Sequence, residues 1–81
     1  MKQIGKVIHY YDKIGVAIVE LTAGLKAGES IRIEKDGEGF EVEVGSMQVE
    51  HKDVSKAKTG DQVGIKVSER PKGNAVVYLL E

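Results

Sequence analysis

The sequence predicts an all-β protein: a small, closed, six-stranded antiparallel β-barrel with one short helical turn near residues 53–58. Apolar residues recur mostly at every second position, not at the 3.6-residue spacing of a helix. Loops containing Gly, Asp or Lys separate the apolar stretches. The chain has no cysteine, so a core rich in Val and Ile must stabilise the fold without disulfides.

Six strands are predicted, each with one apolar and one polar face. They span about residues 3–11, 14–21, 29–35, 40–51, 61–69 and 75–80. In the fourth, Phe40, Val42 and Val44 alternate with polar residues. Such alternation is typical of an antiparallel sheet with one solvated face. Because the 81-residue chain shows no linker or low-complexity tract, we predict one domain over residues 1–81.

The predicted strand 40–51 changes the parity of its apolar positions. These positions are even-numbered up to Val44 and odd-numbered at Met47 and Val49. A slip of one residue would turn the strand inside out unless a β-bulge absorbs it. We therefore expect a bulge near Gly45, where the strand bends around a corner of the barrel.

The segment from Asp53 to Gly60 is the candidate helix. Asp53 suits the N-cap position, and Gly60 suits the C-terminal end. Val54 and Ala57 would share one helical face. We expect one or two turns that close one end of the barrel.

Two stretches share the pattern Lys, any residue, Gly and an acid, followed by alternating β-branched residues. They are LKAGESIRI at 25–33 and AKTGDQVGIKV at 57–67. Turn chemistry accounts for both, because Gly adopts a conformation that other residues resist and the acid then begins a strand. A phosphate-binding loop would need several converging backbone NH groups in a Gly-rich run. The repeat therefore predicts two strand entrances.

The sequence contains no recognisable catalytic, nucleotide or metal motif. GxxxxGK[ST] and GxSxG are absent, and His9 and His51 lack the spacing of a zinc motif. Glu34, Glu41 and Glu43 fall on the solvated face of the strand pattern, where charges protect sheet edges. An unrecognised catalytic site would need a pocket lined by titratable groups. We predict that the chain is not an enzyme and uses no cofactor or metal.

The net charge of −1 is spread unevenly along the chain. Residues 26–50 carry net −4, and residues 51–72 carry net +3. This balance argues against a polybasic nucleic-acid tail or a binder of anionic membranes. No apolar run has the length of a membrane span, and MKQIGK does not resemble a signal peptide. We expect a cytoplasmic protein with no membrane partner, and its oligomeric state stays open.

The segment SMQVEHKDVSKAKTGDQVGI, residues 46–65, resembles the second half of domain 2 in translational GTPases. Elongation factor Tu, elongation factor 1-alpha and the selenocysteine-specific factor are of this type. GLKAGESIRI (24–33) and ERPKGNAVVYL (69–79) are similar to other parts of the same domain. The resemblance implies a closed six-stranded barrel that acts here without its GTPase domain.

This resemblance implies a non-catalytic binding module that contacts ribosomal RNA, tRNA, the ribosome or a translation protein. In the tRNA carriers an acidic residue occupies the position that aligns with Gln48 here. The candidate binding residues are Gln48, His51, Lys52, Lys56, Lys58, Arg70, Lys72, Tyr10 and Tyr11. The basic side chains would contact phosphates, and the tyrosines would stack on a base. Alternatively, the lysines form a solvated face, one tyrosine plugs the barrel end and the other lies on its rim.

A second resemblance points to another class of function. VIHYYDKIGVAIVEL, residues 7–21, is similar to the opening of the C-terminal barrel of collagenase-like peptidases. That barrel is an accessory module without catalytic residues. The alternative function is thus an accessory protein-interaction module that docks on a separately encoded enzyme, as the peptidase barrel accompanies its catalytic domain, or that forms a homodimer through the same patch. Its docking patch would use apolar residues of the second and sixth predicted strands, namely Ala17, Val19, Val76, Val77 and Leu79.

Overall fold

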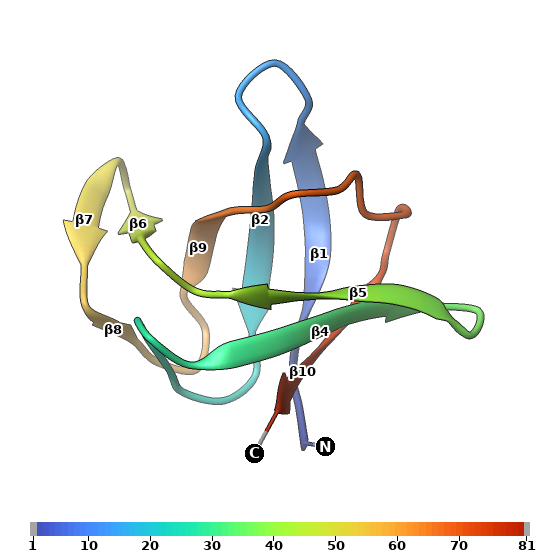
Figure 1. Cartoon of the computed structure of the whole chain (residues 1–81). Coiled ribbons are helices and arrows are strands. Elements are labelled where there is room, and N and C mark those ends of the chain that lie inside the picture. Colours follow the sequence, from blue (N-terminus) through green and yellow to red (C-terminus); the bar gives the residue numbers. More distant parts are fainter. Residues whose placement is uncertain (1, 81) are drawn as a thin grey trace.

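The computed structural model describes residues 2–80 and contains only strands and loops. The strands are β1 (Lys2–Tyr11), β2 (Val16–Leu21), β3 (Leu25–Lys26), β4 (Ser30–Lys35), β5 (Glu38–Glu43), β6 (Met47–Val49), β7 (Lys52–Val54), β8 (Lys56–Ala57), β9 (Gln62–Lys66) and β10 (Val76–Leu80) (Figure 1). The prediction of an all-β protein is therefore confirmed.

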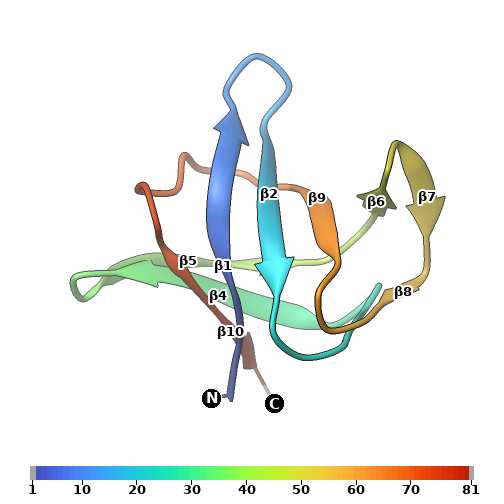
Figure 2. The same cartoon turned by 180° about the vertical axis from the view of Figure 1, so that it is seen from behind.

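One curved sheet contains eight of these strands in the order β5-β4-β10-β1-β2-β9-β6-β7. The remaining two, β3 and β8, pair with each other. All pairs are antiparallel. No ladder joins the end strands β5 and β7 among the described residues, so closure into a six-stranded barrel is not observed. Figure 2 shows β1, β2 and β9 side by side from the back.

The core lies inside the curve of the sheet and follows the predicted alternation. On β2 the buried residues are Ala17, Val19 and Leu21, and between them lie half-buried or polar ones. The core also contains Ile4, Val7, Leu25, Ile31, Ile33, Val44, Met47, Val63, Ile65, Val67, Ala75 and Val77. No polar or charged residue is buried among those described. Apolar burial of small and β-branched side chains is thus the main stabilising contribution.

The parity change near Gly45 marks a break between two strands, not a bulge within one. β5 pairs with β4, whereas β6 pairs with β9. Between them, the Val44 NH donates to Glu29 O at 2.9 Å, and the Gly28 NH donates to Val44 O at 2.7 Å. The chain thereby crosses from one side of the core to the other while burying Val44 and Met47. The ladder irregularities lie in β1 instead, between Gln3 and Gly5 and between Val7 and His9.

The helical turn predicted near residues 53–58 is wrong. This segment forms β7 and β8, which pair with β6 and β3. The Asp53 carboxylate accepts a hydrogen bond from Gln48 Nε2 at 3.1 Å and does not cap a helix. Val54 and Ala57 do pack against the core, as their spacing indicated, but two short strands place them there. Two or three residues are too few to show a period.

The repeated Lys-x-Gly-acid pattern forms the same turn twice, as predicted. The acid in each copy accepts a hydrogen bond from the lysine NH: Lys26 N to Glu29 Oε1 at 2.7 Å, and Lys58 N to Asp61 Oδ2 at 3.0 Å. The φ angle of the glycine is 95° in one copy and 93° in the other. Both values match the third residue of a type II turn, a position that favours Gly.

Candidate docking groove

The basic residues predicted to bind RNA do not form one surface. Lys52 and Lys56 lie on β7 and β8, at the left of Figure 1. Arg70 and Lys72 lie in the loop before β10, at the right of the same view. Lys72 Nζ is 3.0 Å from Glu38 Oε1, so its charge is paired. The clustered Lys52–Lys58–Lys72 face that would favour RNA is therefore not formed.

The loop before β10 and the β4–β5 hairpin line an open pocket of about 220 Å³. Lys35 Nζ donates to Gly73 O at 2.7 Å across it, and Lys72 pairs with Glu38 on the same hairpin. The guanidinium carbon of Arg70 lies 5.8 Å from the centroid of the Tyr10 ring. These basic groups anchor the loop to the sheet, which is a structural role.

The two predicted stacking tyrosines lie on opposite sides of the sheet. Tyr10 packs against the core opposite Ala17. Tyr11 is 49% exposed, and its ring meets the His9 ring edge-to-face at a centroid distance of 4.4 Å. Tyr10 is therefore partly buried against the core, whereas the Tyr11 ring is exposed.

The docking patch expected on the second and sixth predicted strands is not formed. Ala17, Val19 and Val77 are fully buried, and Val76 and Leu79 are half-buried. Among residues 2–80, the large apolar side chains that remain exposed belong to the first hairpin and are Ile8 (40%), Tyr11 (49%) and Ile14 (58%). Ile14 occupies a loop position that periodicity cannot interpret, so the sequence patterns missed it.

Two of these side chains line a groove of about 510 Å³ on the outer face of β2, β9 and β6. We call it the outer groove. Its apolar lining includes Tyr11, Ile14 and Val16. Its polar lining comes from two separate segments, Glu50 and His51 in the β6–β7 turn and Asp61 and Gln62 at the start of β9. Ile18, Gln48, Val49 and Gly64 also line it. Of the predicted site residues, the groove contains Tyr11, Gln48 and His51.

The floor of the groove is bare backbone where it crosses the centre of β9, because Gly64 has no side chain. Gly64 is paired with Ile18 on one side and with Gln48 on the other. A Cβ atom at Gly64 would lie 3.3 Å from Val16 Cγ1 and 3.6 Å from Ile18 Cδ1. The two apolar side chains of β2 therefore pack over bare backbone, which leaves a hollow beside them.

Backbone hydrogen bonds hold two of the lining segments in place. In the first hairpin, the Gly15 NH donates to Tyr11 O and the Val67 NH donates to Gly15 O, each at 2.9 Å. Before β9, the Gly60 NH donates to Leu21 O at 2.9 Å, and the Asp61 carboxylate accepts from the Lys58 NH at 3.0 Å. These two segments are therefore fixed relative to the sheet.

The charge balance of the groove is acidic. Its lining includes the carboxylates of Glu50 and Asp61 and no lysine or arginine. Among residues 2–80, no group of three or more His, Cys, Asp or Glu side chains is placed to hold a metal ion. The groove thus combines apolar side chains with two carboxylates.

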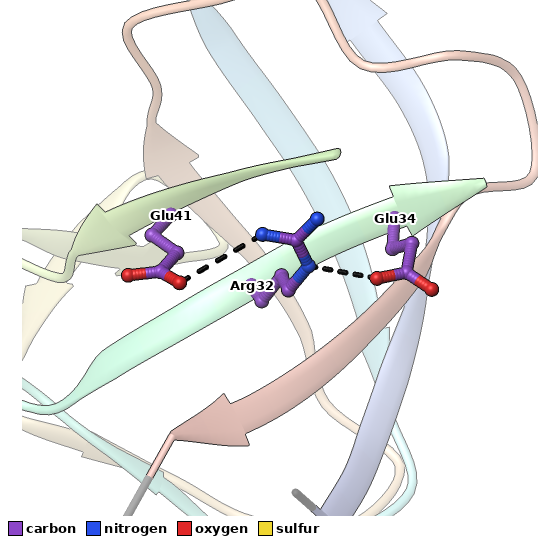
Figure 3. A network of polar contacts seen from close by, with 3 residues as sticks. All are labelled: Arg32, Glu34 and Glu41. Atoms are coloured by element: carbon purple, nitrogen blue, oxygen red, sulfur yellow. Dashed lines mark hydrogen bonds and ion pairs between the residues drawn. The ribbon is translucent and has the colours of Figure 1, made fainter. Parts of the chain in front are cut away.

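The polar network in Figure 3 lies elsewhere, on the outer face of β4 and β5. Arg32 Nε is 2.7 Å from Glu34 Oε1, and Arg32 Nη1 is 3.7 Å from Glu41 Oε2. The hydrogen bond that Arg32 Nε donates to the Glu34 carboxylate raises the pKa of Arg32 above its usual value. Because the network lines neither cavity, its role is to connect neighbouring side chains on the sheet surface.

Comparison with known proteins relates this chain to peptidases. No protein-family model matches the sequence. The chain is 42% identical over 80 residues to the uncharacterized protease MJ0090 of Methanocaldococcus jannaschii. This match covers 98% of the chain but only 20% of the archaeal protein, so the chain spans about a fifth of that relative.

Two solved structures share the fold. The C-terminal domain of a U32 peptidase from Geobacillus thermoleovorans matches with a TM-score of 0.90 at 17% identity, covering 99% of this chain and 93% of that domain. The selenomethionine variant of the same domain matches with a TM-score of 0.85 at 20% identity, covering 96% of this chain and 99% of that one.

These findings correct the expectations drawn from translation factors. The matching structures are peptidase C-terminal domains and the curated relative is a protease, so the predicted roles in RNA binding, ribosome contact and protein biosynthesis are wrong. The resemblance to collagenase-like peptidases is supported instead. In the described part of the chain, no helix is long and apolar enough to cross a membrane. The chain has the fold of the C-terminal domain of a U32 peptidase.

Proposed function

We propose that this chain is a non-catalytic accessory module that docks a U32-type peptidase onto a protein partner, or docks on the peptidase itself. The observation that carries the proposal is the 42% identity over 80 residues to one fifth of a protease. The remainder of such a protein has ample length for a catalytic domain. This chain would then supply binding and no chemistry.

The shape of the chain supports a docking role. Its accessible surface is 5106 Å². A stable protein interface takes about 800 Å² from each partner, which is roughly a sixth of that surface. The outer groove and the exposed first hairpin form an apolar region with a polar rim, as the centre and edge of an interface do.

A binding experiment tests the proposal. The 81-residue chain is titrated calorimetrically into a U32-type peptidase from which the matching C-terminal domain has been deleted. We expect saturable binding in the micromolar range or tighter, and altered hydrolysis of a protein substrate such as casein by the peptidase. Absence of both effects would contradict the docking role. Casein hydrolysis by the purified chain alone would contradict its non-catalytic character.

A further inference from the structure

The repeated Lys-x-Gly-acid pattern leads into two strands that occupy equivalent places in the sheet. The copy at residues 25–33 continues into β4, and the copy at residues 57–65 continues into β9. The first residues of the two copies, Leu25 and Ala57, pair with each other. β4 lies between β5 and β10, and β9 lies between β2 and β6. The outer faces of β4 and β9 can therefore be compared position by position.

The eighth residue of each copy lies on that outer face, between two buried neighbours. In the first copy it is Arg32, which pairs with Glu41 on β5 and Tyr78 on β10. Its guanidinium bonds to Glu34 and approaches Glu41, so charged side chains occupy the surface there (Figure 3). In the second copy the equivalent residue is Gly64, which has no side chain to cover the strand.

Apolar side chains surround Gly64 on the side of β2. Gly64 pairs with Ile18, whereas its counterpart in the first copy pairs with a glutamate. Val16 Cγ1 and Ile18 Cδ1 lie within 4 Å of the place where a Cβ of Gly64 would stand. Tyr11 and Ile14 add exposed apolar lining to the same groove. The fold thus fills this position with an ion-paired arginine in one copy and leaves it open between apolar side chains in the other.

We propose that the outer groove binds a short segment of a partner protein through one aromatic side chain, whose ring lies over Gly64. The ring would contact Val16 and Ile18, and its neighbours in the segment would reach Tyr11 and Ile14. Glycine within a strand marks places where a ligand or another chain approaches closely, and aromatic rings cover such glycines in sheets. This inference deepens the docking role proposed above and rests on it.

The size of the groove selects a short segment over a second copy of this chain. Twelve residues line the groove, whereas a stable interface between two folded proteins takes roughly 20–30 residues from each. Its volume is about 510 Å³, and pockets for small ligands have roughly 300–1,000 Å³. One aromatic side chain with its neighbours along a segment is an occupant of that size.

The ends of the sheet strands favour a partner other than an attached peptidase. Lys2 pairs with Leu79, so β1 begins where β10 ends (Figures 1 and 2). Tyr11 is the last residue of β1, about 30 Å from its start at roughly 3.3 Å per residue. In a C-terminal domain the preceding part of a peptidase enters at the start of β1. The Tyr11 side of the groove therefore stays open to a third protein.

The test begins with a displayed library of random decapeptides panned against the 81-residue chain. We expect an enriched motif centred on one Phe, Tyr or Trp. A synthetic peptide with that motif is then titrated into the isotope-labelled chain, where the ring current should shift the α protons of Gly64 upfield. Replacing the aromatic residue of the peptide by Leu should abolish the shift and weaken binding roughly fivefold. A library without an aromatic motif, or ring-current shifts away from the groove, would overturn the inference.

Gly64→Ala provides the variant test. The added methyl group would stand in the groove against Val16, and it should weaken peptide binding about tenfold through overpacking. Ile14→Ser is a second variant that should weaken binding roughly fivefold through lost apolar contact, without unfolding the chain, because this side chain is already 58% exposed. If both variants bound the peptide like the unmodified chain, the groove would not be the site.

The matched control is Gly45→Ala. Gly45 does not have a positive φ, has open space at its Cβ position and lies outside the lining of the groove. This variant should bind the peptide like the unmodified chain. Equal weakening by Gly45→Ala and Gly64→Ala would reject the groove, because the effect would not depend on its floor.

Sedimentation of the unmodified chain decides between a segment and a second copy. A monomer that binds the peptide supports the proposal, whereas a dimer that Gly64→Ala abolishes would assign the groove to a second copy and overturn it. The two proposals fail separately: a chain that binds the peptidase but enriches no aromatic peptide keeps the docking role and loses the groove.

Discussion

At the scale of single residues, the most constrained positions are the glycines of the repeated turn. Gly28 and Gly60 have φ angles of 95° and 93°, in the left-handed region. No other atom lies within 4 Å of the place where a Cβ would stand at either residue. Any cost of a side chain there therefore comes from the backbone conformation and not from a clash.

Gly28→Ala isolates this backbone cost. We expect a loss of about 1–2 kcal/mol in the free energy of unfolding, since an L-residue resists positive φ. Urea denaturation measures it. The matched control is Gly73→Ala, because Gly73 also has open space at its Cβ position but does not have a positive φ. Equal stability of the two variants would show that the turn relaxes to accept a side chain.

The surface network of Arg32 gives a second prediction at this scale. Arg32 donates to Glu34 through Nε and approaches Glu41 through Nη1. Arg32→Lys keeps the charge but removes the planar group that makes both contacts. The urea midpoint should fall slightly at low salt, and the difference should shrink in about 1 M NaCl, where the Debye length is about 3 Å. A salt-independent difference would instead indicate lost packing.

The same network fixes the sign of one pH effect. The folded state raises the pKa of Arg32 above its usual value, chiefly through the hydrogen bond to Glu34. A raised cationic pKa stabilises the fold at every pH below the unfolded-state pKa, and that contribution is lost only as the pH rises through the folded-state pKa. Between about pH 6 and pH 10, Arg32 should therefore add no pH dependence to the unfolding midpoint.

At the scale of elements, the two copies of the repeated turn dock on the rest of the sheet in the same way. The Gly28 NH donates to Val44 O, and the Val44 NH donates to Glu29 O. In the second copy, the Gly60 NH donates to Leu21 O, and the Leu21 NH donates to Asp61 O. The turns at residues 26–29 and 58–61 therefore make equivalent backbone contacts. The strands that lead into them, β3 and β8, pair with each other.

Sequence patterns predicted the longer strands because alternation over five or more residues has a clear period. β1, β2, β4, β9 and β10 all lie within or close to their predicted ranges. The predicted strand 40–51 failed because two strands with different partners follow one another across Val44–Ser46. Periodicity reports which side a residue faces and carries no information about the partner strand.

The candidate site was only partly predictable for the same reason. Tyr11, Gln48 and His51 were singled out, but for contacts with RNA. Ile14 was missed because loops have no period, and Gly64 was missed because its importance depends on Val16 and Ile18 beside it. The positive φ angles of Glu50 and His51 depend on the register of β6 with β7, which alternation does not specify.

At the scale of the whole molecule, the sheet has two end strands, β5 and β7, that lack a second neighbour among the described residues. Hydrogen-bonded pairs alternate along the β4–β5 hairpin, beginning with Lys35 and Glu38 beside the two-residue loop. The backbone groups of Gly39, Glu41 and Glu43 therefore point away from β4, along the free edge. The two glutamate side chains on that edge are exposed.

Charged side chains on an edge strand oppose pairing with another chain. The double substitution Glu41→Thr and Glu43→Thr removes this protection and installs β-formers. We expect concentration-dependent association through β5, which sedimentation velocity would detect as faster-sedimenting species. The matched control, Glu20→Thr with Glu69→Thr, removes the same charge without changing the edge, because β2 is paired on both sides. If both double variants associated equally, net charge and not the open edge would control the assembly of this molecule.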